Sequence, residues 1–243
     1  MSGVIDVAGL SVNVLTEKEM TSFMRIFLSN DYMNIVYMIS VDTCTYVYDK
    51  PDQIELLNGS DLLLPAEKII LSKRYRHTIR GVVRSYKNFF YVLKNKKFVK
   101  SLFIIGKNEK ETEQLVDILH GLNEKINVCG TYSVDQEQDH ETVINEINEK
   151  VPDIIITVLD IEQTQEWLAA NRYKFNAKLC VALCDVSENI IKENISPPKW
   201  IVSLYLEKIY YRIIRKKYTE NKKKERIFQA LLADYKDKRS DQA

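Results

Sequence analysis

The chain has 243 residues, of which 45% are hydrophobic and 28% charged, and its formal net charge is +1. This length suits one large domain or a domain with an appendage, and seven glycines and five prolines are too few for collagen or long disordered linkers. The longest apolar runs fall far short of the ~18 residues that a membrane-spanning helix needs. No basic stretch of the signal-peptide type opens the sequence. We therefore expect folding in the cytosol.

The first hundred residues mix short strands with helices that have recognisable start signals. A capping box, Thr16-Glu17-Lys18-Glu19, opens one helix, and Lys50-Pro51-Asp52 opens a second that ends at Gly59. The expected strands are Leu10–Leu15, Asn34–Val41 and Leu62–Leu64.

From about residue 100, apolar runs alternate with segments of helical periodicity. The expected strands are 101–106, 126–132, 153–159 and 178–185, and the expected helices are 109–125, 141–150 and 162–171. This alternation is typical of right-handed βαβ crossovers. It predicts an α/β fold: a mostly parallel, Rossmann-like sheet with flanking helices and a C-terminal helical appendage. Gly106 should lie at the carboxyl end of a strand, where such sheets bind ligands.

Positive charge is concentrated in two segments. Nine basic residues and two acids lie between Lys208 and Arg226, and ten Lys/Arg without any acid lie between Leu71 and Lys100. Such segregation favours an anionic partner, which could be a membrane face, a nucleic acid or a phosphorylated ligand. The plainer alternative is a solvated surface.

The tail that begins at Pro197 contains two amphipathic stretches with basic residues on their other faces. We predict an α/β domain over residues 1–196 and a basic amphipathic helical tail over residues 197–243, which can lie in an anionic membrane interface. The alternative is that its apolar side docks on the protein's own core. The candidate membrane-binding residues are Arg215, Lys216, Lys217, Lys222, Lys223 and Lys224.

The cysteine spacing and the aromatic residues among the basic ones bear on metal and nucleic-acid binding. Cys44, Cys129, Cys180 and Cys184 form no C-x-x-C pair, so buried structural thiols are expected, with no metal site and no cofactor.

Lys/Arg interleaved with Tyr and Phe between Tyr75 and Lys100 would suit nucleic acid, but no RNP, KH or helix-turn-helix signature accompanies them. Nucleic acid is therefore not the expected partner; salt-sensitive DNA or RNA binding would revive that reading.

Several short sequences occur in the order seen in a known family. They are Ser60-Asp61-Leu62-Leu63-Leu64, Ser101–Gly106, Gly130-Thr131-Tyr132, Pro152-Asp153-Ile154-Ile155, and Pro198-Lys199-Trp200 followed by Leu206-Glu207. Together they resemble the WecG/TagA/CpsF family of bacterial glycosyltransferases over roughly residues 8–218.

The resemblance implies transfer of N-acetylmannosamine-type sugars from a UDP donor to a polyprenyl-linked acceptor, in cell-surface polysaccharide biosynthesis. It implies a cytoplasmic protein, peripheral on the inner face of the cell membrane, because the family's basic C-terminal appendage is thought to reach that membrane. An active paralogue or a second copy of the chain is a further candidate partner.

The polar site positions depart from the family pattern. The proposed catalytic aspartate falls on Ala66, the family's asparagine on Ser40, and the tail arginine one place before Arg212. The resemblance places a vestigial cleft at Ser40, Ala66, Gly81, Gly106, Tyr132, Thr164 and Gln165.

Alanine cannot accept a proton, and loss of a general base costs roughly 10²–10⁴ in rate. We therefore predict a catalytically degenerate family member that acts as a binding or partner subunit, and whether it is an enzyme stays open at this point. The alternative is an active UDP-sugar-dependent transferase with displaced catalytic residues, for which Glu67, Glu188 and Arg212 are the candidates. Turnover of a UDP-sugar separates the two.

Overall fold

The computed structural model describes residues 3–67, 69–71, 85–94, 100–136, 140–184 and 221–240. Its strands are β1 (Gly3–Val7), β2 (Leu10–Val14), β3 (Asn34–Ile39), β4 (Leu62–Pro65), β5 (Ser101–Gly106), β6 (Asn127–Ser133), β7 (Ile154–Val158) and β8 (Leu179–Ala182). Its helices are α1 (Glu17–Ser29), α2 (Val41–Val47), α3 (Pro51–Asn58), α5 (Ser85–Lys94), α6 (Glu109–Leu122), α7 (His140–Lys150), α8 (Ile161–Asn171) and α12 (Asn221–Ser240), with a short 3-10 turn at Val134–Gln136.

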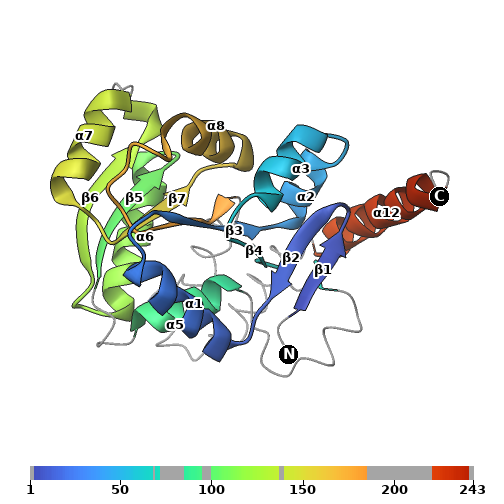
Figure 1. The fold of residues 1–243 in the computed structure, drawn as a ribbon, viewed down its shortest axis with the longest axis horizontal. Coiled ribbons are helices and arrows are strands. Elements are labelled where there is room, and N and C mark those ends of the chain that lie inside the picture. Colours follow the sequence, from blue (N-terminus) through green and yellow to red (C-terminus); the bar gives the residue numbers. More distant parts are fainter. Residues whose placement is uncertain are drawn as a thin grey trace, which may run out of the picture.

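A six-stranded sheet forms the centre of the molecule, in the order β4-β3-β8-β7-β5-β6 (Figure 1). All of its pairings are parallel. The predicted α/β fold with a parallel sheet is therefore confirmed. Since parallel strands all point one way, their carboxyl ends share one edge of the sheet, and the loops that follow them meet there.

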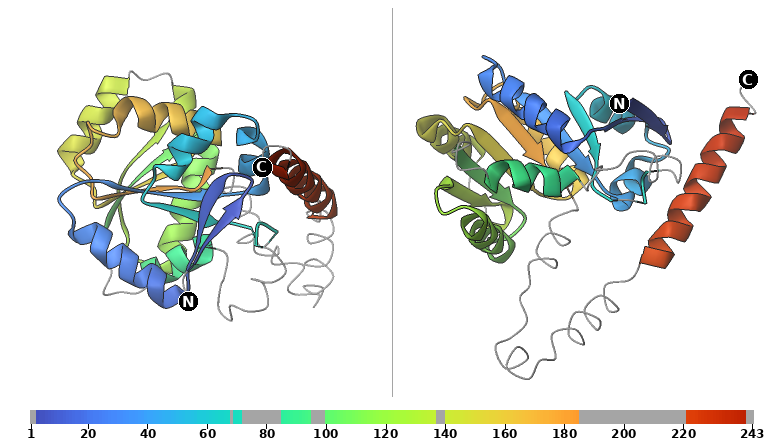
Figure 2. Two further views of the ribbon diagram at one scale, coloured as in Figure 1. Left: turned by 45° about the vertical axis from the view of Figure 1, so that its right-hand side comes forward. Right: turned by 90° about the horizontal axis from the view of Figure 1, so that it is seen from below.

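Helices cover both faces of this sheet, because alternate side chains of each strand point to opposite sides and the central strands are mostly apolar on both sides. One face packs against α1, α5 and α6, and the other against α2, α3, α7 and α8 (Figures 1 and 2). On β7, for example, Ile154 and Ile156 belong to the first core and Ile155 to the second.

An N-terminal hairpin, β1–β2, was not predicted as a pair, although Leu10–Leu15 was expected as a strand. Its turn needs left-handed backbone at Ala8 (φ 53°) and Gly9 (φ 88°), a conformation that glycine adopts without a Cβ penalty. The hairpin lies beside edge strand β4, where the Asn13 Oδ1 atom accepts the Leu63 N–H at 3.0 Å. It thereby satisfies a backbone donor that an open sheet edge would leave unpaired.

Two helices occupy places that sequence patterns did not assign. Strand β3 ends at Ile39 and not at Val41, because Ser40 caps α2 in a reciprocal pairing with Thr43. Helix α5 places Phe89 and Phe90 in the core, so these two aromatic rings are packing residues and are not exposed for base stacking. The Thr16 capping box of α1, in contrast, forms as predicted.

The last amphipathic stretch of the sequence forms α12, which lies beside α2 and the β1–β2 hairpin, on the opposite side of the molecule from α7 (Figure 1). Phe228 and Leu231 are buried against the body, and burial of a large apolar side chain contributes about 1.5–3 kcal/mol. The predicted boundary at residues 196/197 and the first amphipathic stretch (202–213) lie outside the described residues. No helix in the described part is long and apolar enough to cross a bilayer.

Candidate functional site

Four of the described residues carried over from the family lie at or just beyond the carboxyl ends of strands, but in two separate groups. Ser40 and Ala66 follow neighbouring strands β3 and β4, whereas Gly106 and Tyr132 lie on β5 and β6. Strands β8 and β7 separate the groups, and at ~4.8 Å per strand β3 is about 14 Å from β5. The sheet order thus places them along one edge without gathering them around one point.

In the first group, Ser40 and Ala66 form hydrogen bonds with other groups of the protein. The Ser40 Oγ atom accepts the Thr43 N–H at 3.0 Å and contacts the Thr43 hydroxyl at 3.1 Å. The Ala66 N–H donates to the Ile39 carbonyl oxygen at 2.8 Å. Both Ser40 and Ala66 have no exposed surface. Ser40 therefore acts as a helix cap, and Ala66 is a core residue.

Glu67, a candidate displaced base, makes two structural contacts. Its Oε2 atom accepts the Val41 N–H at 3.0 Å, at the start of α2. Its Oε1 atom lies 3.8 Å from the Lys224 ammonium of α12, which also pairs with Asp42. The backbone donor and the cation together hold this carboxylate in place. In this arrangement Glu67 joins β4, α2 and α12.

At the second group Gly106 is needed for close packing. A Cβ atom at this position would lie 1.9 Å from the Thr112 hydroxyl oxygen on α6. That hydroxyl donates to the Asn108 carbonyl oxygen at 2.8 Å and contacts the Ser133 hydroxyl at 3.2 Å. The glycine therefore lets α6 approach the end of β5. Sequence patterns singled out Gly106 but gave no sign of Thr112 or Ser133.

Tyr132 and the two positions on α8 are also buried. Burial, with the nearby Asp135 charge, raises the pKa of Tyr132. The Thr164 hydroxyl donates to the Asp160 carbonyl oxygen at 2.7 Å, and the Gln165 Nε2 atom donates to the Gln53 carbonyl oxygen of α3 at 3.3 Å. Among the described residues, the Gln165 Oε1 atom has no hydrogen-bond partner. Gln165 thus links α8 to α3, whereas the Thr164 bond lies within α8 and its N-cap, and all three side chains are buried.

The remaining sequence candidates are only partly described. Six of them lie outside the described residues: Gly81, Glu188, Arg212, Arg215, Lys216 and Lys217. The side chain of Lys222 is likewise not described. Lys223 is exposed, as a membrane-binding residue would be. Lys224 is turned toward the body, where it contacts Asp42 and Glu67.

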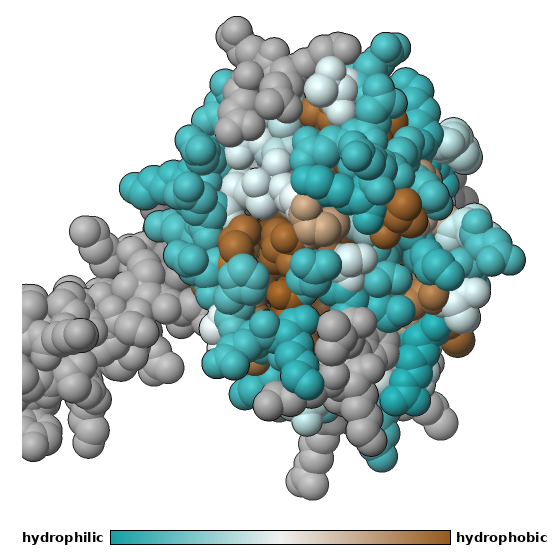
Figure 3. All heavy atoms as spheres, turned by 90° about the vertical axis from the view of Figure 1, so that its left-hand side faces the viewer, coloured by the Kyte–Doolittle hydropathy of each residue, from teal (hydrophilic) through white to brown (hydrophobic). Residues whose placement is uncertain are grey.

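A hollow opens between α6 and edge strand β6, next to the second group. Its lining combines carboxylates with hydroxyls and one valine: Glu109, Thr112, Glu113, Val116, Asp117, Thr131 and Ser133. Figure 3 views the molecule from this side and shows apolar surface surrounded by hydrophilic side chains. An acidic lining repels the phosphates of a nucleotide. The charge of this hollow therefore does not suit it to bind a nucleotide-sugar donor.

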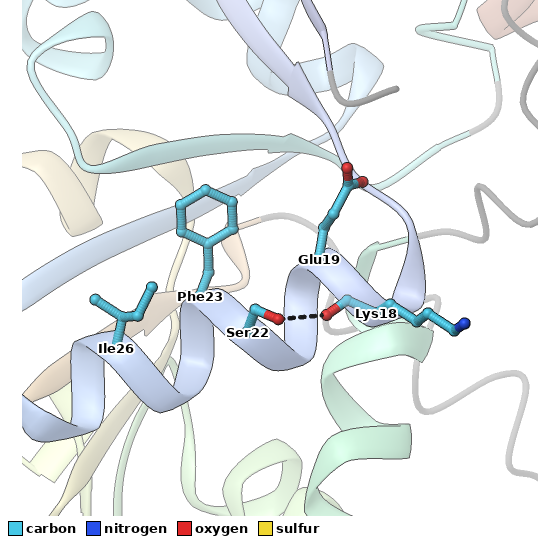
Figure 4. Close-up of a pocket in the computed structure, with 5 residues that line it drawn as sticks. All are labelled: Lys18, Glu19, Ser22, Phe23 and Ile26. Carbon is cyan, nitrogen blue, oxygen red and sulfur yellow. Dashed lines mark hydrogen bonds between the residues drawn. The ribbon is translucent and has the colours of Figure 1, made fainter.

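A second hollow runs along the outer side of α1, between Lys18 and Ile26 (Figure 4). Phe23 and Ile26 supply apolar surface, and the Ser22 hydroxyl donates to the Lys18 carbonyl oxygen at 3.0 Å within the helix. It contains none of the residues that the family resemblance selected.

The cysteines behave as structural thiols where they are buried. Burial raises the pKa of Cys44 to about 12, with a smaller contribution from the Glu67 charge, and burial likewise raises the pKa of Cys180 to about 12. Cys184 is also buried, and Cys129 is half-buried. Neutral buried thiols are poor nucleophiles. Within the described ranges, no three His, Cys, Asp or Glu side chains come together as a metal site would require.

The parallel sheet, its shared carboxyl edge and the order of the crossovers define a Rossmann-like α/β protein of the kind that binds ligands at that edge. Comparison with known families is more specific: the glycosyl transferase WecG/TagA/CpsF family matches residues 5–218. The chain belongs to this family, as the resemblance indicated. No match to a curated protein was found. Helix α12 begins after the last matched residue.

Proposed function

We propose that this family member serves cell-surface polysaccharide synthesis as a catalytically degenerate binding or partner subunit at the inner face of the membrane. One observation carries the proposal. Ala66, where the resemblance places the family's carboxylate, is fully buried, and the neighbouring Glu67 contacts the Val41 N–H and Lys224.

The geometry supports this over a displaced base at Glu67. A general base must reach the proton that it removes, at about 2.6–3.2 Å or through one water. Glu67 would have to give up both its backbone contact and its ion pair to do so. The tail supports the location: α12 has seven Lys/Arg against three Asp/Glu, and about 1 kcal/mol per basic residue is available at an anionic surface.

Turnover of UDP-N-acetylmannosamine with a polyprenyl-linked acceptor tests the proposal. We expect turnover to be absent or very slow in the wild-type protein, and Ala66→Asp alone not to restore it, because Ser40 and the other departures remain. Robust wild-type turnover would overturn the degenerate reading and favour displaced carboxylates.

Thermal unfolding with UDP sharpens the result for a protein without turnover. A ligand present at roughly 100 times its Kd adds about 2.7 kcal/mol to the free energy of unfolding. Stabilisation by UDP would indicate a subunit that still holds the donor nucleotide. An unchanged melting temperature would indicate one that acts through a protein partner alone.

A further inference from the structure

Helix α12 is held on the protein by a set of carboxylates that we call the acidic platform: Asp6, Asp42, Asp49 and Glu67. The Arg239 Nη1 atom lies 2.8 Å from Asp6, and the Lys238 Nζ atom lies 2.8 Å from Asp49. Lys224 contacts Asp42 and Glu67 at the other end of the helix. The platform is built from the hairpin, α2, the turn between α2 and α3, and the end of β4, so it exists only in the folded protein.

Most of these pairs are open to water. The side chains of Lys238 and Asp49 are 51% and 66% exposed, and those of Arg239 and Asp6 are 69% and 46% exposed. Exposed ion pairs are individually weak and are screened by salt. These ionic contacts of Lys238 and Arg239 are therefore easily exchanged.

The surface that α12 presents to the body is also the surface that an interfacial helix needs. Phe228 and Leu231 are buried against the core, Leu232 packs beside them, and Ile227 is 43% exposed at the edge. Cations flank this apolar stripe at both ends of the helix. The same cations and apolar side chains cannot contact the platform and a lipid surface at once.

We propose that α12 is a switchable anchor that exchanges the acidic platform for anionic lipid headgroups. Without a membrane, the carboxylates hold Lys224, Lys238 and Arg239; at an anionic bilayer, lipid phosphates replace them and the apolar stripe enters the interface. This inference rests on the membrane association proposed above. It adds that the platform regulates this association, because it competes with the bilayer for α12. Release of α12 also frees Glu67 and Asp42 from Lys224.

Vesicle binding by the full-length protein tests the competition. The platform variant is Asp6→Asn, Asp42→Asn and Asp49→Asn; the control variant, Glu113→Gln, Asp117→Asn and Glu124→Gln, makes the same charge change at exposed sites on and after α6. On phosphatidylglycerol-containing vesicles we expect the platform variant to bind about tenfold more tightly than the control, because three competing pairs are gone. Asp49→Asn alone, at an exposed side chain, should give a smaller effect in the same direction.

Hydrogen exchange then reports whether α12 leaves the body. Anionic vesicles should raise exchange in α2 and the β1–β2 hairpin of the wild-type protein, and phosphatidylcholine vesicles should not. Equal vesicle affinity of both triple variants, or unchanged exchange in α2 on bound protein, would overturn the switch while leaving membrane association intact. Absence of vesicle binding by every variant would overturn both, and turnover assays judge the degenerate transferase independently.

Discussion

The two ends of the sheet's carboxyl edge differ in how completely the protein's own contacts fill them. Beyond β3 and β4, Ser40 and Ala66 are buried, Glu67 accepts a hydrogen bond from the Val41 N–H, and Lys224 of α12 contacts Glu67 from outside. Beyond β5 and β6, Gly106 lets α6 pack closely, and a hollow with an acidic lining opens beside it.

The difference shows that a residue can match the family pattern because the fold needs it, or because the chemistry needs it. Gly106 matches the family because the packing of β5 against α6 needs a glycine, whatever the chemistry. At Ala66, where the resemblance places the family's aspartate, the small side chain fits the core. Retained backbone landmarks therefore report on the fold, and in the function proposed above the missing carboxylate reports on the chemistry.

The largest effect is expected from Ala66→Asp. Aspartate at this fully buried site would place a charged carboxylate next to that of Glu67. We therefore expect a loss of about 3–5 kcal/mol in the free energy of unfolding. Thr131→Asp, at an exposed position on β6, is the matched control and should cost about 1 kcal/mol or less. Urea denaturation measures both. A loss below about 1 kcal/mol for Ala66→Asp would mean that the β3–β4 end is open to water.

A smaller effect is expected from Gly106→Ala at the other end. The added methyl would collide with the Thr112 hydroxyl and displace it from Asn108 and Ser133, at a cost of about 1–3 kcal/mol. Thr112→Ala in the same chain should recover part of this loss, because it removes the colliding atom. Gly121→Ala, where nothing lies within 4 Å, should be neutral or stabilising by up to about 1 kcal/mol. Additive losses in the double variant would argue against the proposed contact.

The smallest effect concerns the pH dependence of α12. The Tyr48 hydroxyl donates to Asp234 at 2.5 Å, and this bond, with Lys238, lowers the pKa of Asp234 from 3.8. A carboxyl whose pKa is lower in the folded state stabilises that state above its unfolded value and loses this contribution as the pH falls through the folded value. Asp49 and Asp234 raise the pKa of Lys238, so its contribution is present at neutral pH and lost only on the alkaline side.

We therefore expect α12 to loosen locally as the pH falls below about 4, before the sheet unfolds. NMR signals of α12 and α2 should shift over that range while those of β5 and β7 stay unchanged. Asp234→Asn removes the titrating group and should shrink the change. An identical acid response in this variant would assign the effect to other carboxylates.

Sequence patterns predicted the second half of the sheet closely, because its strands are continuously apolar and its helices have clear start signals such as Asn108 and Asp160. They missed α2, since Val41–Val47 is rich in β-branched residues and reads as a continuation of β3. Chain order could place Ser40, Ala66 and Gly106 at strand ends. It could not show that Lys224 would reach Glu67, because that contact depends on how a distant helix docks.

The hairpin and α12 are joined across almost the whole chain. Asp6 binds Arg239, 233 residues away, and also accepts a hydrogen bond from the Tyr235 hydroxyl at 3.2 Å. During synthesis, β1 and β2 therefore emerge from the ribosome long before their final neighbours exist. Contacts of such sequence separation form slowly, so the α/β body can assemble first and the hairpin acquires its last contacts only after residue 239 has emerged.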